Sequence, residues 1–378
     1  MKIILLLIIN FIYSQGAFDV LRPYFGYNNS QISINSIGNA TVASGFSIIG
    51  STSNPANLGT HRFSSIQSSL SNKNFNSENN QITQTGFNGV NLIMPISVYR
   101  GSLVFSGGFQ KDIDYLSTSS DNLYLYSEEG GLYRWNFAMA VEFAKKIFFG
   151  AEIKYFTGSD NMTEFGDQVT YNYNPEYRGF GFSIGMLHSI SRFFQYGVSI
   201  DLPTSLSVKD NFTYSNLNNI DESYSDTWNY RTKKPLVLHA GFGFFIKNIN
   251  LFYELEWADW KNLEFSSSEI YEDDLELPAS VFINQEINSI FSSTLSHHLG
   301  TSIRIPFTPV KFLAGYEYLP VPFSNLYDSN IRESYSVGFS MPIHKNISLE
   351  GSYVNYTWGY MGIDESYDKY SFGINLSY

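Results

Sequence analysis

The sequence contains no cysteine and few charged residues. Without Cys the chain can form no disulfide, no thiolate metal site and no lipid-modified N-terminal Cys. The absence of stray thiols is compatible with export from the cell. Charged residues make up 15% of the 378 positions, whereas a soluble domain usually has about a quarter. Aromatic residues supply 17% of the chain, which is high beside so little charge.

Basic residues are outnumbered, and the sequence motifs of enzymes are missing. The chain has 23 Lys+Arg against 35 Asp+Glu and a net charge of −12, which argues against nucleic acid as a partner. Of the six His, only His297 and His298 are adjacent, and neighbours on a strand face opposite sides. No P-loop, HExxH or GxSxG motif occurs. We therefore expect no enzyme activity, no cofactor and no metal.

Long apolar runs are also absent, except at the N-terminus. Lys2 precedes the apolar residues 3–9, and small residues follow at Ser14 and Gly16. This order predicts a secretory signal peptide over 1–14, with cleavage after Gly16 as the alternative. A membrane anchor is the other interpretation, but a spanning helix needs about 20 apolar residues. No later stretch comes near that length.

What the chain does have is apolar residues that recur with period two. The last segment is the clearest example. Its apolar positions are Tyr370, Phe372, Ile374, Leu376 and Tyr378, and its polar positions are Lys369, Ser371, Gly373, Asn375 and Ser377. Successive side chains of a strand point to opposite faces, so this pattern predicts a strand with one apolar and one polar face.

The same alternation predicts fourteen strands in all. Six short turns separate them at one end, near Tyr99, Lys145, Ser191, Lys247, Thr308 and Lys345. Seven long polar connections follow the other ends, among them 71–85, 115–131, 158–175 and 216–232. Pro203 cannot donate to a ladder, so 193–215 is either two strands or one bent strand, and we expect one. The predicted strands are 62–70, 86–97, 101–114, 132–144, 147–157, 176–190, 193–215, 233–246, 249–264, 294–306, 310–319, 333–343, 347–360 and 367–378.

Alternating strands are compatible with a soluble sheet or with a membrane barrel. Paired strands, connections of alternating length and aromatic residues near strand ends favour the barrel. Closure also satisfies every backbone group in lipid. The sequence therefore predicts an all-β fold, a 14-stranded antiparallel transmembrane β-barrel over 61–378. Ending on aromatic Tyr378 resembles the C-terminal signal that the bacterial barrel-assembly machinery reads.

Residues 17–60 do not alternate, and they predict a hatch inside the lumen. They are rich in small residues, as in 36–45 (SIGNATVASG) and 53–59 (SNPANLG), and Pro55 fixes the chain direction after Asn54. A periplasmic tail is the other interpretation. With Asn54-Pro55-Ala56 directly before the first strand, this segment resembles the hatch of the FadL/TodX family of outer-membrane transporters of hydrophobic compounds. Parts of 235–260, 313–323 and 335–356 are also similar to that family.

The resemblance implies passive uptake of small hydrophobic molecules, of the long-chain fatty acid or aromatic hydrocarbon type. It implies export to the bacterial outer membrane, a monomer, and contact with outer-membrane lipid and lipopolysaccharide. The region 158–232 lacks the long apolar helical loops of the best-known members. Secretion-associated barrels also carry an Asn-Pro-Ala motif, so a partner-binding outer-membrane protein without small-molecule transport is the alternative.

The alternation along each strand indicates which side chains face the lumen of the barrel. We expect these side chains to face the lumen: Glu142, Phe148, Glu152, Phe156, Phe252, Glu254, Glu256, Arg304 and Leu313. Gly107 and Gly108 interrupt the third strand, where paired Gly often marks a bend. In the FadL-like family a kink in the third strand opens a lateral exit, so we expect one here, with Asn54-Pro55-Ala56 packed beside it. Simple relief of crowding is the other interpretation. Residues 281–291 are expected to form a short helix above the barrel mouth.

Overall fold

The computed structural model describes residues 16–28, 31–45, 53–77, 80–120, 124–166, 168–218, 222–267, 278–323, 331–360 and 363–378. The predicted signal peptide falls on residues that lie outside these ranges. Within them, no helix is both long and apolar enough to cross a membrane.

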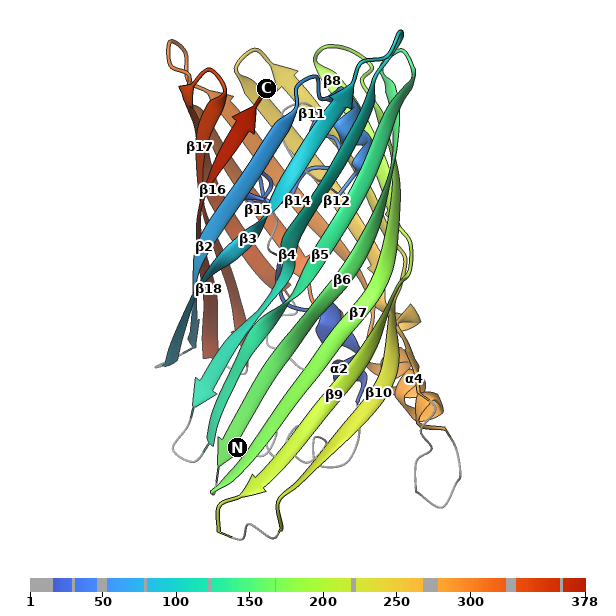
Figure 1. The fold of residues 1–378 in the computed structure, drawn as a ribbon, viewed down its shortest axis with the longest axis vertical. Coiled ribbons are helices and arrows are strands. Elements are labelled where there is room, and N and C mark those ends of the chain that lie inside the picture. The colour runs from blue at the N-terminus through green and yellow to red at the C-terminus, as the bar shows by residue number, and fades with distance from the viewer. Residues whose placement is uncertain are drawn as a thin grey trace.

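One antiparallel sheet closes on itself and surrounds the N-terminal segment (Figure 1). Its strands run in chain order from β2 to β18, and β18 returns to pair with β2. The strands are β2 (Ser65–Ser77), β3 (Asn80–Ile96), β4 (Leu103–Ser120), β5 (Tyr124–Ala144), β6 (Ile147–Gly166), β7 (Val169–His188), β8 (Phe194–Asp201), β9 (Thr204–Asn216), β10 (Tyr224–Lys234), β11 (Val237–Ile246), β12 (Ile249–Asp259), β13 (Glu264–Ser266), β14 (Ser293–Arg304), β15 (Lys311–Pro320), β16 (Ile331–His344), β17 (Ile347–Tyr360) and β18 (Ile363–Ser377).

These strands make a barrel of 14, as the alternation predicts. β8 and β9 are the two halves of one barrel strand that bends at Pro203, because both pair with β7. β10 and β11 are likewise halves of the next strand, with Pro235 between them, and they pair with β9 and β8. The short β13 continues β12 after a break and pairs with β10. The single bent strand at Pro203 is thus confirmed.

The barrel is apolar outside and polar inside, which reverses the arrangement of a soluble sheet. On β18, Phe372 is 66% exposed and Ile374 48% exposed, whereas Lys369 and Ser371 are fully buried. The same reversal holds on β11, where Leu238 and Phe244 are exposed and His239 is buried. An outward apolar band is what a barrel in lipid requires.

Four of the predicted long connections are wrong, because most of their residues are strand. β4, β5, β6 and β7 reach 18 to 21 residues and form hairpins that extend far past one end of the barrel (Figure 1). The residues 71–85, 115–131, 158–175 and 216–232 lie largely in such extensions. The prediction failed because it required an apolar face on every strand. Outside lipid a hairpin needs only its ladder and cross-strand side chains.

Helix α4 (Ala279–Ile290) follows β13 at the same end as the long hairpins (Figure 1). The prediction of a short helix over 281–291 is confirmed. Its buried residues are Ala279, Ile283 and Ile287, which recur at helical spacing on one face.

Barrel closure can be tested with a designed disulfide. Ser71 of β2 and Ser371 of β18 are directly opposed in the register, and the chain has no other thiol. Opposed residues lie within the Cα separation that a disulfide needs. We expect the double variant Ser71→Cys, Ser371→Cys to cross-link in folded protein and to run with altered mobility on non-reducing gels. The control pair Ser71→Cys, Ser366→Cys should not cross-link. Equal cross-linking of both pairs would contradict the register.

Candidate functional site

The described residues between Gly16 and Thr60 lie inside the barrel (Figure 1), and we refer to them as the hatch segment, or hatch. Their elements are α2 (Ala17–Leu21), η1 (Arg22–Tyr24), β1 (Tyr27–Asn28), α3 (Ile32–Asn35) and η3 (Pro55–Thr60). Even the polar Ser36, Thr41 and Asn54 are almost fully buried. Small side chains let the segment fill a confined polar lumen.

Asn54 joins two parts of the hatch to the wall. Its Oδ1 accepts the backbone N–H of Ala56 at 3.0 Å, and so caps η3. Its Nδ2 donates to the carbonyl oxygens of Val42 and of Met186 on β7, both at 2.9 Å. An amide that donates and accepts at once serves this role. The predicted place beside Gly107 is wrong, because the Asn54 side chain is committed to β7.

Two wall glycines make that approach possible. A Cβ on Gly185 would lie 2.0 Å from Asn54 Oδ1, and one on Gly150 would lie 2.4 Å from the backbone of Pro55 and Ala56. Any larger residue at either site would displace the Asn54-Pro55-Ala56 turn. The turn therefore fits into a groove left by absent side chains on β6 and β7.

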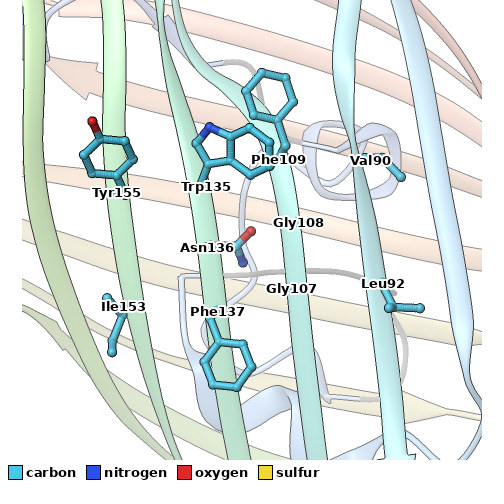
Figure 2. Close-up of a pocket in the computed structure, with 10 residues that line it drawn as sticks. All are labelled: Val90, Leu92, Gly107, Gly108, Phe109, Trp135, Asn136, Phe137, Ile153 and Tyr155. Carbon is cyan, nitrogen blue, oxygen red and sulfur yellow. The ribbon is translucent and has the colours of Figure 1, made fainter.

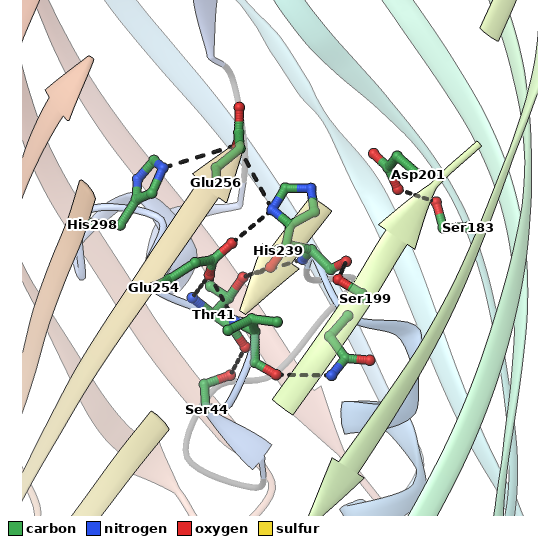
Figure 3. Close-up of polar contacts among 12 residues, drawn as sticks. Thr41, Ser44, Ser183, Ser199, Asp201, His239, Glu254, Glu256 and His298 are labelled. Atoms are coloured by element: carbon green, nitrogen blue, oxygen red, sulfur yellow. Dashed lines mark hydrogen bonds and ion pairs between the residues drawn. The ribbon is translucent and has the colours of Figure 1, made fainter. Parts of the chain in front are cut away.

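A buried carboxylate holds the middle of the hatch. Glu254 of β12 accepts the N–H groups of Thr41 at 2.6 Å and Val42 at 2.7 Å, and His239 Nδ1 lies 3.0 Å from its other oxygen (Figure 3). Gln195 of β8 donates to the carbonyl of Ala43 at 2.6 Å. Hydrogen bonds to an ionised acceptor are about twice as strong as neutral ones. Glu254 thus fixes the hatch backbone from the wall.

Further buried groups extend this contact along β14 and β15. His298 Nδ1 lies 3.1 Å from the carbonyl oxygen of Gly38 and 3.6 Å from Glu317 Oε2. Glu317 Oε1 accepts from Asn39 Nδ2 at 2.9 Å, and Glu256 lies within 4 Å of both His239 and His298 (Figure 3). No group of three such ligands suited to a metal occurs in the described ranges. These carboxylates and imidazoles therefore contact the hatch and one another.

The hatch meets the first barrel strand at His61 and Arg62. Burial, together with the smaller effect of the neighbouring Arg62 charge, lowers the pKa of His61 to about 4. Its imidazole is therefore neutral at ordinary pH. Arg62 Nη2 lies 3.8 Å from Glu142 Oε2, which ties this junction to the end of β5.

Around the first residues of the hatch, toward the long-hairpin end, the interior is apolar and aromatic. The first hatch helix contributes Ala17, Val20 and Leu21, packed with partly buried Phe18 and Phe25. Around them lie buried wall and α4 residues: Tyr115, Leu132, Phe156, Tyr177, Leu206, Val208, Tyr230, Trp260, Phe265, Ile283, Ile287, Phe291 and Phe323. We call this set the apolar chamber. The hatch segment 17–25 fills it.

Tyr24 hydrogen-bonds to the wall of that chamber where two neighbouring barrel strands are interrupted by proline. The breaks at Pro203 and Pro235 are adjacent in the sheet, because β9 pairs with β10 and β8 with β11. Tyr24 Oη lies 3.2 Å from the carbonyl oxygens of Thr204 and Thr232, which lie next to these two breaks. The hatch thus supplies a donor where the two strands bend.

The wall parts between β3 and β4, two residues beyond the predicted glycines. The ladder is continuous through Gly107 and Gly108 and ends at the pair Gly89–Gln110. Beyond that pair β3 follows β2 while β4 follows β5, and their described residues share no further ladder pairs. The hatch strand β1 lies in this gap and pairs with Ile113 and Asp114 of β4. A bend at Gly107 itself is therefore wrong.

Gly107 marks a different feature on the outside of the barrel. An apolar groove of about 420 Å³ lies over it, flanked by Leu92, Phe109, Trp135 and Phe137 (Figure 2). A Cβ on Gly107 would meet only the Asn136 carbonyl at 3.6 Å. Because Gly107 has no side chain, the backbone at this position forms the floor of the groove.

Eight of the nine residues predicted to face the lumen are buried or half-buried, and the ninth, Arg304 at the end of β14, is exposed. Phe148, Glu152, Phe252, Glu254 and Leu313 are at most 5% exposed and Phe156 7%. Glu256 faces the two buried imidazoles, and Glu142 and Arg304 lie near the short-turn ends of their strands. Phe148 packs against Gly59 of the hatch.

Sequence reasoning missed the buried ionic residues Lys73, Asp114, Lys369, His239 and His298. Their only signal is a polar side chain on the inward parity of a strand, which is also the signal of many ordinary lumen residues.

No family model matches the chain, and no curated protein matches it in sequence. Solved structures match over nearly the whole barrel. The CymD monoaromatic hydrocarbon channel has 16% identity and a TM-score of 0.65, covering 93% of this chain and 98% of its own. A Pseudomonas aeruginosa FadL homologue has 11% identity and a TM-score of 0.67, with 94% and 99% covered. The Ralstonia pickettii toluene transporter TbuX has 13% identity and a TM-score of 0.64, with 93% and 98% covered.

The chain has the fold of the FadL and TodX channels. At 11% to 16% identity these matches concern the FadL-type fold alone. They agree with the resemblance found in the sequence.

Removing Glu254 should loosen the hatch while the FadL-type barrel persists. Glu254→Ala leaves the N–H groups of Thr41 and Val42 buried without this acceptor, at about 1–3 kcal/mol each. We expect faster proteolysis of the hatch and leakage of polar solutes through the outer membrane, with heat-modifiable barrel unchanged. Glu254→Gln, which keeps an acceptor oxygen, should be milder. Exposed Glu264 provides the control Glu264→Ala. Hatch proteolysis equal to the parent's in both Glu254 variants would contradict this role.

Proposed function

We propose that the protein allows passive uptake of small hydrophobic molecules across a bacterial outer membrane. The observation that carries this proposal is the apolar chamber, a buried apolar cluster that is larger than the other apolar clusters between the hatch and the wall. A lumen that only needed filling could remain polar and hydrated. Buried aromatic walls instead suit apolar ligands, which gain about 25 cal/mol for each Å² removed from water.

The hatch segment 17–25 occupies the chamber in the present state. Phe18 contacts Phe291 and Phe323, with ring centroids 5.7 and 5.4 Å apart. Displacement of these hatch side chains would vacate an apolar volume bounded by α4 and the wall. A ligand could take their place without exposing the chamber to water.

The gap between β3 and β4 offers a lateral way out of the barrel. β1, a strand of two residues that belongs to the hatch and not to the wall, pairs with β4 at this gap. A short hatch strand can leave with little loss of ladder, whereas a barrel strand cannot. The groove over Gly107 begins beside the same pair of strands and would receive an apolar molecule on the lipid side.

Similar folds support the same class of function. The matching structures include a monoaromatic hydrocarbon channel and toluene transporters. A FadL-type barrel that docks protein cargo is the alternative function. Val281 and Phe282 of α4 are 38% and 37% exposed and would be the apolar residues available to such a partner at the long-hairpin end.

Locking β1 into the gap tests the route. Asn28 and Ile113 are opposed in the register of β1 and β4. We expect the double variant Asn28→Cys, Ile113→Cys to take up toluene slowly when oxidised and at the parent's rate after reduction. Each single Cys variant serves as a control and should be insensitive to reductant. The measurement is uptake of labelled toluene by cells that lack other such channels.

Two results of that experiment have different meanings. Uptake that stays fast with the disulfide formed would exclude the gap as the route but leave transport in place. No uptake by the parent above cells without the protein would contradict transport and favour the cargo-docking role.

Orientation in the membrane gives a separate prediction. The long hairpins should face outward, because outer-membrane barrels have short periplasmic turns and longer external connections. Leu217 lies at the end of β9 and is 64% exposed. With a membrane-impermeant thiol reagent, Leu217→Cys should label on intact cells and Asn248→Cys, in the β11–β12 turn, only after lysis. The reverse order of labelling would contradict the orientation.

A further inference from the structure

An aromatic row crosses the outer face of four neighbouring barrel strands. Phe109, Trp135, Tyr155 and Phe180 are successive partners in the register of β4, β5, β6 and β7. Trp135 and Phe180 are 55% and 58% exposed, and the ring centroids of Tyr155 and Phe180 are 4.9 Å apart. Aromatic residues of membrane barrels gather where hydrocarbon meets the lipid headgroups. This row therefore marks the boundary of the hydrocarbon on the long-hairpin side.

A polar groove of about 420 Å³ lies directly beyond this row, between β6 and β7. Its residues face outward, because Thr157 comes two residues after Tyr155 and Arg178 two residues before Phe180. Arg178 Nη2 lies 3.6 Å from Glu176 Oε2, and these side chains are 70% and 43% exposed. Besides Gly158, the lining consists of hydroxyl, amide and charged side chains: Thr157, Ser159, Asn161, Asn174, Glu176 and Arg178.

The apolar groove over Gly107 lies next to this polar groove along β6. Tyr155 lines the apolar groove and Thr157 the polar one, on the same face of the strand (Figure 2). At about 3.3 Å per residue, their Cα atoms are about 7 Å apart. From Tyr155 the apolar groove continues to Ile153, toward the short-turn end of β6. A molecule with an apolar tail and a polar head fits such a pair of grooves.

Basic side chains continue the polar level across β9 and β10. Arg178 of β7 and Arg231 of β10 lie in one row on either side of β9, about 10 Å apart at the usual strand spacing. Lys209 lies in the next row, opposite Glu176, and Glu129 of β5 lies across the groove. Three basic groups thus accompany two acids here, in a chain of net charge −12.

We propose that this outer face binds a phosphorylated glycolipid of the outer leaflet. The sugar would lie in the polar groove, whose hydroxyl and amide groups both donate and accept hydrogen bonds. The phosphates would be held by Arg178 and Arg231, because a guanidinium fork matches phosphate oxygens. One acyl chain would lie in the groove over Gly107. This site requires that the long hairpins face outward, and it does not depend on transport.

Lipid A, an acylated disaccharide that carries phosphate at both ends, is the probe for this site. Binding to purified full-length protein in detergent is measured by native mass spectrometry. We expect the double variant Arg178→Gln, Arg231→Gln to weaken binding at least about ten-fold, as loss of charge-assisted contacts does. The control Arg100→Gln, Arg192→Gln removes two exposed guanidinium groups from the short turns. It should stay within about two-fold of the parent, because distant exposed charges are screened. Equal loss in both double variants would contradict the site.

Two further variants distinguish a lipid site from residues that are merely solvated. Glu176→Gln removes the acid that competes for Arg178 and should tighten lipid A binding. Gly107→Val places a side chain in the apolar groove, where a Cβ would meet only the Asn136 carbonyl oxygen at 3.6 Å. We expect it to weaken binding about three-fold, since dispersion contacts with the acyl chain are lost. Both variants should keep a heat-modifiable barrel, and binding equal to the parent's in both would overturn the proposal.

A second lipid tests whether the headgroup must be a sugar. We expect the parent to bind lipid A in preference to phosphatidylglycerol when both are present at the same concentration. Equal binding of the two lipids would overturn the glycolipid site. Toluene uptake is a separate measurement. Lost lipid A binding with normal uptake in Arg178→Gln, Arg231→Gln would support the site, whereas absence of uptake by the parent would contradict only the proposed function.

Discussion

The structure depends on the requirement that every backbone polar group in lipid must have a partner. An open sheet would leave an edge in hydrocarbon, at several kcal/mol for each unpaired group. Closure of β18 on β2 removes that edge and fixes the inside and the outside of the molecule. Apolar residues then face lipid and polar ones face the lumen. The hatch can therefore be held by ions and hydrogen bonds such as those of Glu254.

The gap between β3 and β4 departs from this requirement, and the hatch partly compensates for it. The β3–β4 ladder ends at Gly89–Gln110, and β1 supplies ladder partners to β4 in the gap. The hatch is thus part of the wall as well as part of the filling. Under the proposed function, one movement of the hatch would change both the wall and the lumen, and so would serve both entry and exit.

Much of the barrel could be predicted from the sequence, because period-two alternation is a local signal. It predicts the number of strands, the bend at Pro203 and the inward parity of residues such as Glu254. The extended hairpins were missed, since β5 residues 124–131 have no apolar lipid face to reveal them. The place of Asn54 was also missed. It depends on which of many wall glycines meets the hatch, and Gly185 and Gly107 look alike in sequence. Buried Lys73, Asp114 and Lys369 were missed for the same reason, because three separate strands, β2, β4 and β18, bring them together.

The extended hairpins determine where the protein meets its surroundings. A strand of 21 residues, such as β5, is about 70 Å long at about 3.3 Å per residue, whereas about 10 residues suffice to cross the membrane. Under the proposed outer-membrane function, the remaining residues of these hairpins would rise from the hydrocarbon into the polar layer outside it. The same height would make the hairpin tips the first part of the protein that an antibody or a phage meets.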